Sequence, residues 1–235
     1  MAHPQQLQFI KSFSESLSED FSERKILEIG SFDVNGSIRQ FFDKSTYVGV
    51  DLTEGPGVDI VCEGHKIADP DESYDITVSC ECFEHNPHWA ETFLNMWRMT
   101  KGGGIVLFTC ATTGRPEHGT TRSLPKHSPG TQSLNWDYYQ NLTEEDFHQK
   151  FKLDDLFDSY FFIKNTRSCA DLYFAGIRKS ESHRKLFSID LPDVKRRCEA
   201  DQNELLKRKK GRNSFQNHCV LISEKYLKLN RKTPI

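Results

Sequence analysis

Hydrophobic residues along the first three quarters of the chain form short runs that alternate with helical patterns. Between Leu7 and Leu17 apolar side chains recur at nearly helical spacing, which predicts an amphipathic helix ahead of the first strand. Five apolar runs follow, each close to the length of a buried strand. They are Lys25–Ile29, Tyr47–Asp51, Asp59–Val61, Tyr74–Cys80 and Gly104–Cys110. Helical patterns between them, at Ile38–Phe42 and His88–Met99, indicate an α/β fold with a parallel sheet.

The second half of the chain departs from this alternation. Residues 111–141 are rich in Gly, Pro, Thr, Ser and His without periodicity, which is typical of a functional or disordered loop. A helix is predicted at Thr143–Phe151. It is followed by two aromatic runs, Phe157–Lys164 and Ala170–Arg178, which predict an antiparallel hairpin that completes the sheet. We therefore expect one domain over residues 1–179 and a polar, basic helical appendage over 180–235.

Composition narrows the class of protein. Of 235 residues 36% are hydrophobic and 17 are Phe, which suffices for a core without disulfide bonds. The net charge of −3 gives no general attraction to nucleic acid or membranes, and the basic run at 207–212 reads as a solvated helix face or tail. Seven cysteines without a CxxC pair, and no leader or membrane-spanning segment, favour a reduced, cytoplasmic protein.

The segment KILEIGSFDVNGSIRQFF reads as a strand, a glycine turn and a helix that begins near residues 36–37. Gly30 would let the chain turn sharply off the strand, and Gly36 would allow a carboxylate to approach the helix start. Phe32 occupies the position where the dinucleotide fingerprint GxGxxG has its second glycine, so a pyrophosphate would be crowded. The carboxylate of Glu28 at the end of this strand is better explained by a cationic group of the ligand than by a phosphate. The predicted ligand is therefore zwitterionic.

Asp51 ends the next predicted strand, 21 positions after Gly30. This spacing is typical of the acid that accepts hydrogen bonds from a ribose. The alternative is a turn or helix-capping aspartate. An NAD-dependent oxidoreductase would also use Gly30 and Asp51, but the missing middle glycine disfavours it.

With these motifs the chain resembles the class I S-adenosylmethionine-dependent methyltransferases, in particular the small-molecule group of the methyltransferase type 11-like kind. The resemblance covers about Lys25 to Arg178. It rests on LEIGSFDVNGS, YVGVDLTEGPGVDIVCEGHKI, YDITVSCECFEHNPHWAETFLNMWRMTKGGGIVLFT and, more weakly, WDYYQNLTEEDF. It implies a Rossmann-like, seven-stranded, mostly parallel sheet with helices on both faces, and S-adenosyl-L-methionine as the cofactor.

The resemblance also assigns residues to each part of that cofactor. Glu28, Gly30 and Ser31 would lie along the methionine, Asp51 and Leu52 would hold the ribose, Glu63, Gly64 and His65 would border the adenine, and Cys80 and Glu81 would lie beneath the sulfonium. The family usually has Gly at the position of Phe32 and often Asp at that of Glu63. The loop shape and the adenine contact depend on these two departures.

Candidate residues for the acceptor side follow the fourth and fifth predicted strands. His85 would lie at the carboxyl edge of the sheet, where open α/β folds bind ligands; its alternative role is structural. His118 lies on the long loop, which we expect to close over the cofactor as a lid, although a solvated loop fits its composition as well. Two loop histidines and Glu117 lack a defined third-ligand spacing, so no metal site is expected. Trp136 is expected to pack in the hydrophobic shell.

The resulting prediction is methyl transfer to an oxygen, nitrogen or carbon of a small-molecule acceptor, with His85 and His118 as candidate catalytic residues. Methyl transfer mainly requires positioning, so a base is not obligatory. Two alternatives are an RNA methyltransferase that uses the basic C-terminal region and a non-catalytic module that binds an adenosyl ligand. We expect neither a nucleic-acid nor a membrane partner. The identity of the acceptor and the oligomeric state do not follow from the residues.

Overall fold

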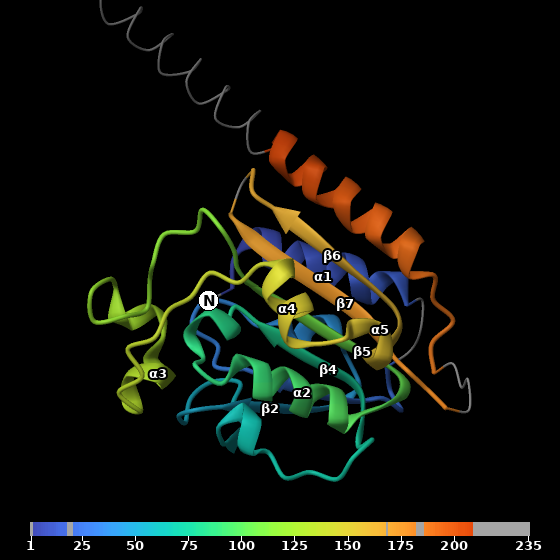
Figure 1. Ribbon diagram of the computed structural model, residues 1–235, viewed down its shortest axis with the longest axis horizontal. Helices are drawn as coiled ribbons and strands as arrows, with labels where there is room; N and C mark the ends of the chain where they lie inside the picture. Colours follow the sequence, from blue (N-terminus) through green and yellow to red (C-terminus); the bar gives the residue numbers. More distant parts are fainter. Residues whose placement is uncertain (1, 18–20, 168, 182–185, 209–235) are drawn as a thin grey trace, which may run out of the picture.

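A seven-stranded sheet in the order β3-β2-β1-β4-β5-β7-β6 forms the centre of the computed structural model (Figure 1), which describes residues 2–17, 21–167, 169–181 and 186–208. The strands are β1 (Lys25–Ile29), β2 (Thr46–Asp51), β3 (Ile60–Val61), β4 (Tyr74–Cys80), β5 (Thr100–Ala111), β6 (Phe157–Asn165) and β7 (Asp171–Arg178). Strands β1 to β5 are parallel, and β7 pairs antiparallel with both β5 and β6. The predicted fold class is confirmed.

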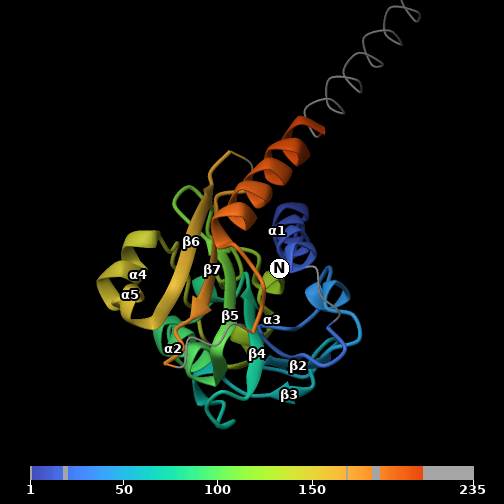
Figure 2. The same cartoon turned by 90° about the vertical axis from the view of Figure 1, so that its right-hand side faces the viewer.

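Helices cover both faces of this sheet (Figure 2). One face carries α1 (Pro4–Ser16), a short 3-10 helix, η1 (Ile38–Phe41), and a helix at 191–208. The other carries α2 (Trp89–Met99), α4 (Glu144–Lys150) and α5 (Leu153–Leu156). Among the described residues no helix is both long and apolar enough to cross a bilayer.

An aromatic stack holds the second face together. The Phe108 ring on β5 stacks on Phe147 of α4 and on Phe174 of β7, with centroids 4.6 and 4.9 Å apart. Phe93 of α2 meets the Phe108 ring edge-on at 5.9 Å. Such pairs each contribute about 0.5–1.5 kcal/mol beyond the area they bury. The many phenylalanines of the sequence therefore tie the hairpin to the parallel part of the sheet.

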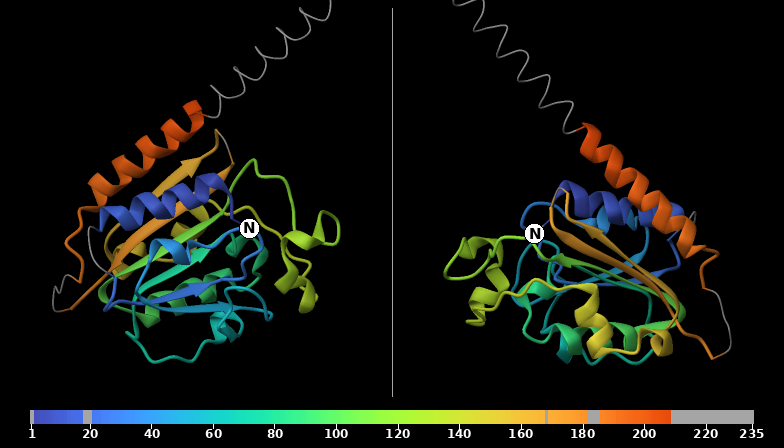
Figure 3. Two further views of the ribbon diagram at one scale, coloured as in Figure 1. Left: turned by 180° about the vertical axis from the view of Figure 1, so that it is seen from behind. Right: turned by 45° about the horizontal axis from the view of Figure 1, so that its top comes forward.

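The helix at 191–208 lies beside α1 across the first face (Figure 3). The Gln202 side chain donates to the carbonyl of Gln5 at 2.6 Å and accepts from Asn165 at 3.1 Å. Ser12 of α1 donates to Asp201 at 2.7 Å. This part of the predicted appendage thus belongs to the core. Residues 209–235, with most of the basic run at 207–212, lie outside the described residues, and the division at residue 180 stays a prediction.

Local signals fixed some element boundaries better than others. The capping box at Thr143 and Asp146 begins α4, because each residue's side chain accepts a hydrogen bond from the other's backbone N–H. The helix expected at Ile38–Phe42 is wrong in kind, since only the 3-10 turn η1 forms, capped by Ser37. Phe42 already leaves the helical conformation, at φ −123° and ψ 44°, so the segment is too short for an α-helix. The segment after Gly36 therefore has no α-helix whose macrodipole could point at the turn around Gly30.

Candidate active site

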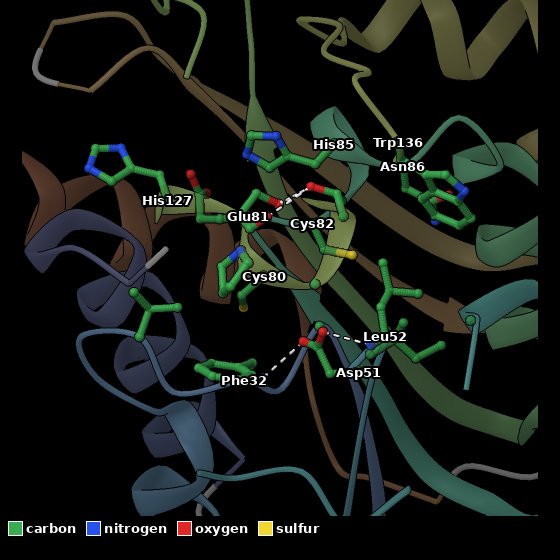
Figure 4. Close-up of a pocket in the computed structure, with 18 of the residues that line it drawn as sticks. Phe32, Asp51, Leu52, Cys80, Glu81, Cys82, His85, Asn86, His127 and Trp136 are labelled. Carbon is green, nitrogen blue, oxygen red and sulfur yellow. Dashed lines mark hydrogen bonds between the residues drawn. The ribbon is translucent and has the colours of Figure 1, made fainter. Parts of the chain in front are cut away.

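A pocket of about 690 Å³, including its open mouth, lies at the carboxyl edge of β1, β2 and β4 (Figure 4). That is the edge where open α/β sheets bind ligands. The strand ends and the turns after them supply Ile29, Gly30, Phe32, Val34, Asp51, Leu52, Cys62, Gly64, Cys80, Glu81, Cys82, His85 and Asn86. The long loop after β5 supplies His127, Ser128, Pro129, Gly130, Thr131 and Trp136. Its size is within the range of ligand pockets in proteins.

Gly30 forms the turn off β1 that opens the pocket floor. Its φ is +86°, and a Cβ built there would lie 2.8 Å from the Cβ of Cys82. Its N–H donates to the carbonyl of Val50 on the neighbouring strand at 2.8 Å. Only glycine meets both conditions without strain. The sequence interpretation of this residue as a sharp turn agrees with this geometry.

Asp51 places a carboxylate on the wall of the same pocket. One oxygen accepts from the N–H of Phe32 at 3.0 Å and the other from the N–H of Leu52 at 2.7 Å. Burial raises the pKa of this carboxyl, while the two backbone donors favour the ionised form. Each oxygen has further lone pairs, so the group can still accept from ligand hydroxyls.

Of the ten residues predicted to bind the cofactor, six line the pocket and four do not. The lining residues are Gly30, Asp51, Leu52, Gly64, Cys80 and Glu81. Ser31 is buried behind the turn, with its Oγ close to the backbone of Gly49. Glu63 forms ion pairs with Lys66 and His65 beside the pocket. Their contact with a cofactor stays a prediction.

Glu28 is the fourth of these residues, and its side chain lies on the α1 face of β1. Successive strand residues point to opposite faces, so Glu28 points away from the face on which Leu27 and Ile29 pack. Its carboxylate accepts from the Tyr47 hydroxyl at 2.8 Å. Burial raises the pKa of Glu28 to about 7, against the effects of that hydrogen bond and of Arg39. A direct contact between Glu28 and a bound amine is therefore not seen in this geometry, and that role stays a prediction.

Glu81 carries a buried negative charge at the end of β4. Its φ of +52° turns the residue off the strand, and its carboxylate lies 3.5 Å from His3 and 4.0 Å from Arg115. Burial would raise the pKa of Glu81, but these two cations outweigh it and hold the pKa below its usual range. His3 also pairs with Asp171 at 2.9 Å; burial lowers its pKa, but the two carboxylates raise it to about 9. The Glu81 carboxylate beside the pocket is therefore ionised, and its charge is balanced by His3 and Arg115.

The two predicted catalytic histidines lie close together. The rings of His85 and His118 meet edge-on with centroids 4.9 Å apart, and only His85 lines the pocket. Burial and the neighbouring His118 lower the pKa of His85 to about 3, so its imidazole is neutral at pH 7. Glu84 is fully buried beside them; burial and the charge of Glu81 raise its pKa. The structure therefore brings His85 and His118 together, with an acid that was not among the predicted site residues.

The long loop after β5 covers the pocket, as a lid would. Within it lie two short helices, η4 (Pro125–His127) and α3 (Pro129–Ser133). A Cβ on Gly130 of α3 would lie 2.8 Å from a carboxylate oxygen of Asp51, so the loop backbone rests on that group. Trp136 lines the pocket and meets the ring of His88, which corrects its expected place in the hydrophobic shell.

Some lining residues carry no sequence signal of their own. Cys82, Asn86 and the backbone of residues 128–131 reach the pocket only because the loop folds back over the strand ends. His3 and Asp171 come from opposite ends of the chain and meet beside Glu81. Arg122 in the same loop forms exposed ion pairs with Glu117 and Asp137. Sequence spacing could not have revealed these pairings.

Comparison with known proteins gives a consistent result. The family described as Methyltransferase domain matches residues 35–108. No curated protein matches the chain. The matched segment runs from the turn after β1 into β5, so this part of the chain is similar to a methyltransferase domain.

Solved structures share the fold at low identity. The chain is similar to 1,6-didemethyltoxoflavin-N1-methyltransferase of Burkholderia thailandensis, a structure with its substrate and S-adenosylhomocysteine bound. The two are 12% identical, the match covers 74% of this chain and 80% of the other, and the TM-score is 0.51. The YcgJ protein of Bacillus subtilis is 14% identical over 72% of this chain and 98% of its own, with a TM-score of 0.48.

Proposed function

We propose that the chain transfers the methyl group of S-adenosyl-L-methionine to a small-molecule acceptor. The observation that carries this proposal is the juxtaposition of Gly30, the Asp51 carboxylate and Glu81 around one pocket. A class I fold with an acid at the end of its second strand is suited to an adenosyl ligand.

The residues present fit the proposed cofactor. Asp51 can accept from the two ribose hydroxyls, because its oxygens are oriented by backbone donors rather than satisfied by side chains. Leu52 and Ile29 offer apolar surface beside it. When bound, the cofactor supplies an activated methyl group on a sulfonium.

The protein's part in the transfer is mainly positioning. An acceptor atom attacks the methyl carbon, the carbon–sulfur bond breaks, and the acceptor loses a proton where it carried one. The loop over the pocket excludes water and limits the size of the acceptor, which raises the effective concentration of the reacting groups. His85 lines the pocket, but burial and His118 lower the pKa of its imidazole to about 3, so it is a weak base and the released proton passes to solvent.

Calorimetric titration of the full chain with S-adenosyl-L-methionine and S-adenosylhomocysteine tests the cofactor assignment. We expect binding in the micromolar range, reduced at least about 10-fold in Asp51→Ala, since hydrogen bonds to a charged group contribute about 1.5–3 kcal/mol. Asp155→Ala is the control, because Asp155 is exposed on α5 far from the pocket lining. Unchanged affinity in Asp51→Ala would overturn the assignment.

Assays of methyl transfer and of RNA binding, combined with this titration, distinguish the alternatives to catalysis on a small molecule. Cofactor binding without methyl transfer to any of a panel of hydroxyl, amine and carbon acceptors would favour a binding module. Salt-dependent RNA binding that is lost when residues 209–235, beyond the helix at 191–208, are removed would favour an RNA substrate. Failure to bind any adenosyl ligand would refute the proposed function as a whole.

A further inference from the structure

A buried group of three side chains lies next to the pocket and takes no defined part in binding the proposed cofactor. Glu84 and His85 come from the short 3-10 helix after β4, and His118 comes from the loop after β5. One oxygen or nitrogen atom from each lies within 4.8 Å of the others. Glu84 is fully buried, and His85 and His118 expose 4% and 8% of their surfaces.

These side chains lack the partners that buried polar groups normally have. Neither carboxylate oxygen of Glu84 and neither ring nitrogen of His85 has a hydrogen-bond partner among the described residues. A buried polar group without a partner costs about 1–3 kcal/mol, so several in one place call for a ligand. Three convergent groups of this type, a carboxylate and two imidazoles, are a frequent ligand set of transition metals.

The orientation of His118 adds an independent indication. Its Nδ1 lies 3.0 Å from the carbonyl oxygen of Pro116, which can only accept. Nδ1 therefore carries the ring proton, and Nε2 keeps its lone pair. Nε2 is buried without a partner among the described residues, and His118 is a member of the cluster. Fixing one nitrogen on a backbone carbonyl so that the other is free is the usual arrangement behind a metal-bound histidine.

We propose that Glu84, His85 and His118 bind a divalent transition-metal ion, of the Zn²⁺ or Fe²⁺ type, beside the pocket. Ligand bonds of about 2.0–2.2 Å would bring the three donor atoms to roughly 3.3 Å from one another, a change that side-chain rotation can supply. Three protein ligands leave a coordination position open, as in catalytic rather than structural sites. The sequence spacing did not indicate this set of ligands. The acid considered there with the loop histidines was Glu117, whereas the acid in the structure is Glu84.

Two other groups of potential ligands occur in the described residues, and neither has the same features. Glu63, His65 and His88 are only half-buried, and Glu63 already pairs with Lys66. His3, Cys169 and Asp171 are held by ion pairs and hydrogen bonds to one another and to Arg115. The Glu84 cluster is distinguished by donors that are both buried and unpartnered.

The position of the ion gives it access to the pocket. His85 contributes to the cluster and also lines the pocket. Gly119, at φ +72°, lets the loop backbone press against the His85 ring, since a Cβ there would lie 2.8 Å from Cε1. An open coordination position near His85 would take an oxygen or nitrogen of the acceptor. This last role rests on the proposed function; metal binding itself does not.

Metal content and binding of the full chain test the proposal. The chain is freed of metal with a chelator and titrated with Zn²⁺, Co²⁺, Mn²⁺ and, without oxygen, Fe²⁺, while calorimetry and the visible spectrum of Co²⁺ are recorded. We expect one ion per chain, a rise in thermal unfolding temperature, and at least a 100-fold loss of affinity in His118→Ala and in Glu84→Gln. His65→Ala, in the half-buried group, is the matched control and keeps wild-type affinity.

Each other outcome is decisive. No binding of any of the four ions to the wild type, or binding that is lost in His65→Ala and kept in His118→Ala, would overturn the proposed site. Affinity for S-adenosylhomocysteine is measured on every variant, and circular dichroism verifies folding. Metal binding without cofactor binding would refute the methyltransferase proposal alone, whereas cofactor binding without metal would refute this inference alone.

Discussion

Acidic side chains lie at the ends of the strands on both sides of the pocket, but those near β1 and β2 are stabilised differently from those near β4 and β5. At the β1–β2 end, Asp51 accepts two backbone hydrogen bonds and Glu28 accepts one from Tyr47. At the β4–β5 end, Glu81 depends on the charges of His3 and Arg115, and Glu84 has no hydrogen-bond partner among the described residues.

The β1–β2 end is therefore preorganised for a ligand, whereas the β4–β5 end lacks a partner for one of its acids among the described residues. Backbone donors keep a carboxylate in place whether or not a ligand is present, so the Asp51 end is ready to bind. An unpartnered buried acid costs free energy until a ligand supplies what is missing. We therefore expect substitutions at the first end to lower stability and cofactor affinity, and substitutions in the Glu84 cluster to change metal binding more than stability.

The largest expected effect concerns the protonation of Glu28. Burial raises its pKa from 4.5 to about 7, so the protonated form is favoured in the folded state. The stability present below pH 4.5 is lost as the pH rises through about 7, by up to about 3 kcal/mol. Glu28→Gln cannot ionise, and chemical denaturation from pH 4.5 to 8 should show a flatter profile than the wild type. Parallel profiles for the two proteins would contradict the raised pKa.

A second expected effect concerns the turn at Gly30. Gly30→Ala places a Cβ in a left-handed conformation and against Cys82, and should lower the free energy of unfolding by about 2 kcal/mol. Gly114→Ala is the control: its φ is +100°, but the nearest atom to the new Cβ is 3.8 Å away. Equal losses in denaturant unfolding would show that the close approach to Cys82 does not matter. Cofactor affinity should fall only in Gly30→Ala.

The contrast between satisfied and unsatisfied acids is tested most directly by a pair of substitutions. Asp51→Ala leaves two N–H groups without an acceptor and should cost about 1–2 kcal/mol of stability. Glu84→Met, in chelator-treated protein, removes an unpartnered group and should leave the stability unchanged or about 1 kcal/mol higher. Denaturant unfolding of both variants gives the comparison. A large loss in Glu84→Met would mean that the Glu84 end is already complete without a metal.

The smallest expected effect concerns the loop. Gly130→Ala would place a Cβ 2.8 Å from the Asp51 carboxylate and so displace the loop. Since the backbone donors hold Asp51 in place, the affinity for S-adenosylhomocysteine should fall by a factor of about 5–10, or about 1 kcal/mol. Lys126→Ala changes an exposed side chain of the same loop that does not line the pocket, and should leave the affinity unchanged. Tighter binding in Gly130→Ala would show that the loop obstructs the pocket and does not close it.

Much of the fold could be predicted from local patterns. The predicted bounds of β1 and β4 coincide with the observed ones, because both strands are short segments buried on both faces. The helix after Gly36 was predicted in the wrong kind, since a short run of apolar periodicity cannot distinguish an α-helix from a single 3-10 turn. The helix at 191–208 was assigned to an appendage, because its contacts with α1 join residues about 190 positions apart.

The sequence by itself determined which segments form the parallel strands, the turn at Gly30 and the acid at Asp51. These features depend on local conformation and on spacing along one βαβ unit. Only the tertiary structure decided that Glu28 points to the α1 face, that Trp136 reaches the pocket, and that Glu84 meets His118. These outcomes depend on strand alternation and on loop closure over long sequence separations. No local pattern encodes the partners that such a loop brings together.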